Sequence, residues 1–118
     1  VMNAYGIYSS ANSNVLKNVI VNGKYSTCGN FNNEYGKTVI TNSEFHTTMI
    51  ADENDKKFSA STITYQGELE LRNSLIERVN VGILYQRPNA TSVEGLTYDD
   101  TVIIKSVVTN DFDNIGYQ

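Results

Sequence analysis

The sequence has few of the residues that build several common functional sites. Its 118 residues include one cysteine (Cys28), one histidine (His46) and one proline. A single cysteine excludes an internal disulfide scaffold and a cysteine-based zinc site. A single histidine excludes a histidine-cluster metal site, and a Ser-His-Asp or Cys-His centre would have to use His46. We therefore expect no cofactor and no metal site.

Charged residues and long apolar runs are also scarce. Charged residues make up 19% of the chain, the net charge is −4, and no run rich in lysine or arginine occurs. Nucleic acids and anionic membrane surfaces are therefore poor partners. No apolar run reaches the roughly 18 residues of a membrane-spanning helix. With 40% hydrophobic residues, the chain is long enough for one domain with a modest core.

What the sequence does contain is a repeated frame. In this frame two apolar residues alternate with polar ones, an Asn or Ser follows, and another apolar residue usually comes three positions later. The separations between successive copies are 24, 31 and 33 residues. Such a strand-like unit with irregular insertions is typical of a solenoid. The copies are NVLKNVIV (14–21), TVITNSEF (38–45), LELRNSLI (69–76) and VIIKSVVT (102–109).

Stacking of these copies predicts three columns of equivalent side chains, one coil above the next at about 4.8 Å. Two of the columns are apolar. The first contains Leu16, Ile40, Leu71 and Ile104, and the second contains Val21, Phe45 and Ile76. The third is a polar ladder of Asn18, Asn42, Asn73 and Ser106, in which each amide can donate to one neighbour and accept from the other.

This frame resembles the coils of the right-handed parallel β-helix, or pectin-lyase-like, superfamily, in which stacked asparagines form a ladder at a bend. The resemblance implies an all-β fold, a right-handed parallel β-helix of about four coils. The alternative is a β-sandwich, in which these asparagines are ordinary turn residues. No convincing amphipathic helix is present. Residues 1–118 are expected to be a single repeat segment of a longer array or assembly.

Aromatic residues in or beside the insertions are the candidate ligand-binding residues. Insertions of a solenoid project from one side, and tyrosine pairs a flat apolar face with a polar tip that suits sugar rings. The alternative is that these aromatics pack on the flanks of the coils. The candidates are Tyr25, Phe31, Tyr35, Phe58, Tyr85 and Tyr98.

Carboxylates are the other residues that could carry chemistry. Asp99-Asp100 resembles the paired aspartates of glycoside hydrolases in this superfamily, but the accompanying Gly-His-Gly and Arg-x-Lys elements are absent. An acidic pair before a strand is also an ordinary turn feature. Asp52, Glu53 and Asp55 lack EF-hand spacing, and adjacent lysines counter their charge, so a solvated loop is favoured over a calcium site. We assign no catalytic residue.

These observations favour a non-catalytic extracellular or cell-surface scaffold that binds a glycan or protein partner along its flank. One alternative is a fragment of a polysaccharide lyase or glycoside hydrolase. The other is a structural subunit that stacks into a fibre or oligomer. A β-helix exposes an open coil at each end, so we also expect self-association or continuation into a longer chain.

Overall fold

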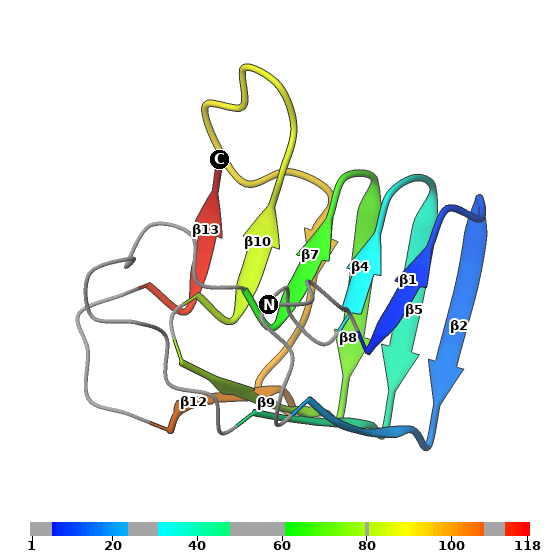
Figure 1. Cartoon of the computed structure of the whole chain (residues 1–118), viewed down its shortest axis with the longest axis vertical. Helices are drawn as coiled ribbons and strands as arrows, with labels where there is room; N and C mark the ends of the chain where they lie inside the picture. The colour runs from blue at the N-terminus through cyan, green and yellow to red at the C-terminus, as the bar shows by residue number, and fades with distance from the viewer. Residues whose placement is uncertain (1–5, 24–30, 48–60, 80, 108–112) are drawn as a thin grey trace, which may run out of the picture.

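The chain forms a parallel β-solenoid built of three sheets (Figure 1). The structure is a computed structural model that describes residues 6–23, 31–47, 61–79, 81–107 and 113–118. In these residues all secondary structure is strand, and successive coils pair in parallel. The predicted all-β parallel solenoid is therefore confirmed, and the β-sandwich alternative is wrong.

Each coil contributes one strand to each sheet. Sheet A contains β1 (Ile7–Ser9), β4 (Phe31–Asn33), β7 (Ile63–Tyr65), β10 (Ile83–Tyr85) and β13 (Ile115–Tyr117). Sheet B contains β2 (Ser13–Lys17), β5 (Lys37–Thr41), β8 (Glu68–Arg72) and β11 (Leu96–Thr97). Sheet C contains β3 (Ile20–Asn22), β6 (Glu44–His46), β9 (Leu75–Arg78) and β12 (Ile103–Ser106). The four stacked strands of sheet B, like those of sheet C, are separated by three turns of the chain. The solenoid therefore has about three turns, fewer than the four expected.

The first three copies of the repeated frame stack in the predicted register. Leu16 lies opposite Ile40, and Ile40 opposite Leu71, in sheet B. The second column forms in sheet C, where Val21 lies opposite Phe45 and Phe45 opposite Ile76. These inward-facing side chains are mostly buried and form much of the core.

The fourth copy is out of frame with the prediction. Ile104 lies opposite Ile76 in sheet C, not in the Leu71 column of sheet B. The strand of the fourth coil in sheet B is instead β11, in which Leu96 lies opposite Leu69. The bend before β12 has no Asn to mark it. The alternating apolar residues of β12 were therefore expected in sheet B, although they lie in sheet C.

Sheet A lines the rest of the core, including a strand the sequence did not predict. Phe31, one of the aromatic candidates in or beside the insertions, starts β4 and lies opposite Ile7 and Ile63. Burying a phenylalanine side chain stabilises a fold by about 1.5–3 kcal/mol. The neighbouring Asn33 is also fully buried, so apolar and polar side chains do not alternate in this strand.

A column of glycines forms the bend from sheet A to sheet B. Gly36, Gly67 and Gly95 each directly precede or open a sheet B strand in successive coils. A Cβ atom on Gly67 would lie 2.0 Å from the carbonyl oxygen of Gly36, and one on Gly95 would lie 2.6 Å from that of Gly67. Only glycine lets the backbones of neighbouring coils approach this closely.

Candidate functional site

The bend from sheet B to sheet C is formed by one asparagine per coil in the first three coils. Asn18, Asn42 and Asn73 have φ angles of 58°, 50° and 47°. Asparagine adopts this left-handed conformation more readily than other non-glycine residues. The residue type that the backbone requires here also carries an amide, and the stacking of coils places these amides in a line.

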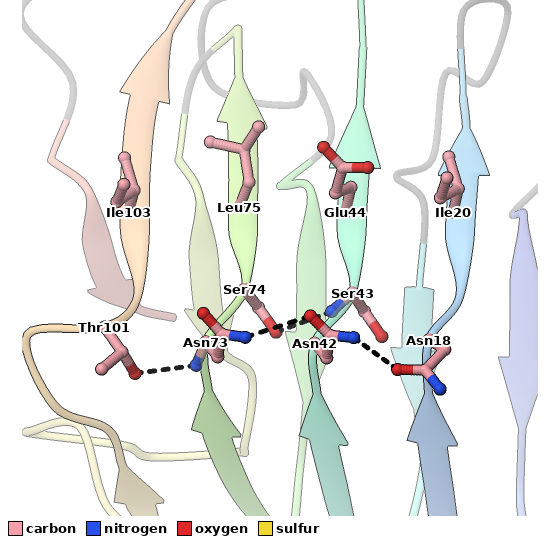
Figure 2. Close-up of a pocket in the computed structure, with 10 residues that line it drawn as sticks. All are labelled: Asn18, Ile20, Asn42, Ser43, Glu44, Asn73, Ser74, Leu75, Thr101 and Ile103. Atoms are coloured by element: carbon pink, nitrogen blue, oxygen red, sulfur yellow. Dashed lines mark hydrogen bonds between the residues drawn. The ribbon is translucent and has the colours of Figure 1, made fainter.

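These three side chains form an amide ladder on the surface (Figure 2). Asn73 Nδ2 donates to Asn42 Oδ1 at 3.0 Å, and Asn42 Nδ2 donates to Asn18 Oδ1 at 2.5 Å. All three residues are exposed, so the ladder joins amides at the surface and not in the core. Their position at left-handed turns also agrees with the alternative interpretation as turn residues, so the two roles coincide.

The fourth position next to the ladder is held by Thr101, not by Ser106. Asn73 donates its backbone N–H to Thr101 Oγ1 at 2.7 Å. Ser106 lies at the end of β12 opposite Arg78, so its assignment to the ladder is wrong. Ser106 and Ile104 belong to the same fourth copy of the frame, which lies in sheet C and not in sheet B.

A second polar row supports the ladder from beneath. The buried Ser43 and Ser74 directly follow Asn42 and Asn73. Ser43 donates its backbone N–H to Ser74 Oγ at 3.2 Å, and the two hydroxyls donate to the carbonyl oxygens of Thr41 and Arg72. These bonds satisfy backbone groups that the sharp bend removes from the sheet ladders.

A row of outward side chains on sheet C runs parallel to the amide ladder (Figure 2). This outer row consists of Ile20, Glu44, Leu75 and Ile103, which lie opposite one another in successive strands. Ile20 and Ile103, at the two ends of this row, are 67% and 58% exposed. A shallow groove of about 440 Å³ lies along the two rows. We call it the ladder groove.

Glu44 is the only charged side chain among the described residues that line the ladder groove. Its carboxylate lies 3.6 Å from His46 Nε2, and His46 Nδ1 lies 3.2 Å from Glu77 Oε1. The Lys105 ammonium lies 3.6 Å from the same Glu77 oxygen. The Lys105 ammonium therefore contacts Glu77, and among the described residues the ion pair of Glu44 is with the His46 imidazole, which also contacts Glu77.

The structure does not bring the aromatic candidates together. Phe31 is fully buried and Tyr85 is 5% exposed, so both are core residues and cannot stack on a ligand. The ring of Tyr85 packs on Tyr65, with ring centroids 5.2 Å apart. Tyr35 and Tyr98 are about half exposed, but Tyr35 precedes β5 and Tyr98 follows β11, and β8 lies between these two strands of sheet B. Tyr25 and Phe58 lie outside the described residues.

Asp99 has a structural role in the turn before β12. Its Oδ1 accepts hydrogen bonds from the backbone N–H and hydroxyl of Thr101, and its Oδ2 lies 3.4 Å from Arg72 Nε. The hydrogen bonds from Thr101, together with the Arg72 charge, lower the pKa of Asp99 below its ordinary value. The carboxylate thus holds Thr101 against the ladder.

Several other sequence candidates cannot be placed. Asp52, Glu53, Asp55 and Cys28 lie outside the described residues. Within the part of the chain that the structure describes, no group of three or more His, Cys, Asp or Glu side chains could hold a metal ion. The same part contains no helix long and apolar enough to cross a membrane.

Sequence reasoning found the amides of the site but missed the outer row. The signal was present, because each outer-row residue follows its bend residue by two positions: Asn18 and Ile20, Asn42 and Glu44, Asn73 and Leu75, Thr101 and Ile103.

Comparison of the chain with protein-family models, curated proteins and solved structures found no match in any of the three.

Proposed function

We propose that this chain is a non-catalytic β-helix module of the pectin-lyase-like kind, located outside the cell or at its surface. In this proposal it binds a glycan chain along the ladder groove. The observation that carries the proposal is the pairing of the amide ladder with an exposed, mainly aliphatic outer row.

The two rows supply the two kinds of contact that a sugar chain needs. An asparagine amide has two N–H donors and a carbonyl with two lone pairs, and the ladder uses one donor each of Asn42 and Asn73. The remaining donors and lone pairs can bond to hydroxyls. The side chains of Ile20 and Leu75 offer apolar surface to the C–H face of a sugar ring.

The spacing of the coils favours a glycan over an extended peptide lying along the solenoid axis. Ladder amides recur once per coil, about 4.8 Å apart. Side chains on one face of an extended peptide recur about every 6.6 Å, and so fall out of step with the coils after one repeat. An extended β-1,4-linked pyranose chain advances by close to one coil spacing per sugar, and successive rings are turned over, so sugars of the same orientation meet about every second coil.

The test is affinity for a panel of hexasaccharides measured by calorimetry. The panel contains β-1,4-linked glucose, xylose, mannose and N-acetylglucosamine, with oligogalacturonate as the acidic member. At least one neutral hexamer should bind, and Leu75→Thr should weaken its binding about tenfold, equivalent to about 1.4 kcal/mol. Val15→Thr removes an exposed apolar side chain from the outer face of sheet B and should leave binding unchanged. Absence of binding to every hexamer, or equal loss in both variants, would overturn the proposal.

A structural role in an assembly is a second candidate, favoured by the open edges of the sheets. In the described residues β2 and β11 are edge strands of sheet B, and β1 and β13 are edge strands of sheet A. Backbone groups at such edges can pair with another chain. Sedimentation velocity should then show association that rises with concentration and weakens in Ile115→Lys, which places a charge on β13. A monomer at all concentrations would contradict this role.

A further inference from the structure

Glu44 interrupts an otherwise aliphatic row at its centre. Ile20 precedes it and Leu75 follows it in the adjacent strands of sheet C, and the three side chains share one face. An ordinary outer-face carboxylate has solvated or charged neighbours along its row. Here the neighbours along the solenoid axis are apolar, so a ligand lying on the row meets one charge at a defined coil.

The charges around Glu44 leave it available to a cationic ligand. His46 on its own strand, Glu77 on β9 and Lys105 on β12 are the titratable groups of the adjoining row. The Lys105 ammonium contacts Glu77, and the His46 imidazole is shared between Glu77 and Glu44. Among the described residues no lysine or arginine forms an ion pair with Glu44, whose side chain lines the ladder groove.

We propose that Glu44 makes the ladder groove selective for an amino-sugar chain, such as β-1,4-linked glucosamine, over neutral and acidic glycans. The inference rests on the proposed function, because it assigns the ligand class of the same groove. The ammonium group of one sugar pairs with Glu44, its hydroxyls bond to the ladder amides, and its ring lies on the adjacent aliphatic side chains. A uronic acid at this position would place two carboxylates against each other.

The test compares glucosamine hexamer with N-acetylglucosamine hexamer by calorimetry near pH 6, where the free amine is largely charged. The free-amine hexamer should bind about tenfold more tightly, as expected for a charge-assisted contact. Glu44→Gln should remove this difference. His46→Gln removes the competing imidazole and should tighten binding of the free-amine hexamer.

Glu70→Gln is the matched control, because Glu70 faces outward on sheet B, away from the groove, and the variant changes the net charge equally. Equal affinities for the two hexamers that do not change in Glu44→Gln would overturn the selectivity and leave the proposed groove intact. Equal losses in Glu44→Gln and Glu70→Gln would show that the effect comes from net charge, which also overturns it. Absence of binding by either hexamer and by the rest of the panel would overturn both proposals.

Discussion

At the scale of single residues, the asparagines of the bend combine two requirements. The backbone at Asn73 needs a left-handed φ, and the groove needs an amide that faces its neighbours. Glycine meets the first requirement and no other residue meets both as well. Replacement of Asn73 therefore separates backbone conformation from ladder bonding.

Asn73→Leu should lower the free energy of unfolding by about 1–2 kcal/mol from conformational strain alone, and further through loss of the ladder bond. Asn73→Gly adopts the left-handed φ angle without strain and loses only the ladder bond, so it should lower the free energy of unfolding by about 0.5–1.5 kcal/mol. Urea unfolding of the two variants measures the difference. If Asn73→Leu is as stable as the wild type, the left-handed bend is not required.

Asp99 gives the bend a dependence on pH. Its pKa is lowered in the folded chain, so the ionised carboxylate contributes stability above the ordinary value of 3.8, and this contribution is lost as the pH falls through the lower folded value. Asp99→Asn should destabilise the fold at neutral pH, and the difference from wild type should shrink as the pH falls below 3.8. Urea unfolding at several pH values measures this.

Asp100→Asn is the control, since no hydrogen bond or ion pair of the Asp100 side chain is seen in the described part of the chain. It should show no such change with pH. An equal cost for Asp99→Asn at neutral and strongly acidic pH would show that its charge is irrelevant.

At the scale of elements, the sequence predicted the strands in which apolar and polar residues alternate. It missed strands in which they do not. Sheets B and C of the first three coils follow from alternation and the Asn position. Sheet A could not be predicted at Phe31–Asn33, because the buried Asn33 breaks the alternation. The frame error in the fourth coil arose because Thr101 replaces Asn at the bend.

The glycine column sets how closely neighbouring coils approach at the bend from sheet A to sheet B. Gly67→Ala would place a methyl group 2.0 Å from the Gly36 carbonyl oxygen, so neighbouring coils would have to separate. We expect a loss of about 1–3 kcal/mol, as for overpacking of a tight interior. Gly116→Ala in β13 is the control, because among the described residues its added methyl would meet the Val81 side chain alone, at an ordinary 3.7 Å, and should cost little. Thermal and urea unfolding should rank the two, and equal stability would contradict the close approach of coils at this bend.

At the scale of the whole molecule, stacking turns single residues into rows. Each coil contributes one amide or hydroxyl and one outer-row side chain, and the solenoid aligns them into a groove along its flank (Figure 2). The candidate site could be predicted only in part, because its amides belong to a visible repeat while its aliphatic row depends on register. The ligand proposed for it follows from the spacing and charge of the two rows.

The most direct measurement is an NMR titration of the ¹⁵N-labelled chain with the hexasaccharide that binds best in the panel. The account predicts saturable shifts of the side-chain NH₂ signals of Asn18, Asn42 and Asn73 and of the backbone amides of Glu44 and Leu75. The signals of the outer face of sheet B, such as Val15 and Glu70, should stay unchanged. Shifts confined to sheet B or to the exposed tyrosines Tyr35 and Tyr98, with the ladder signals unmoved, would contradict binding in the ladder groove.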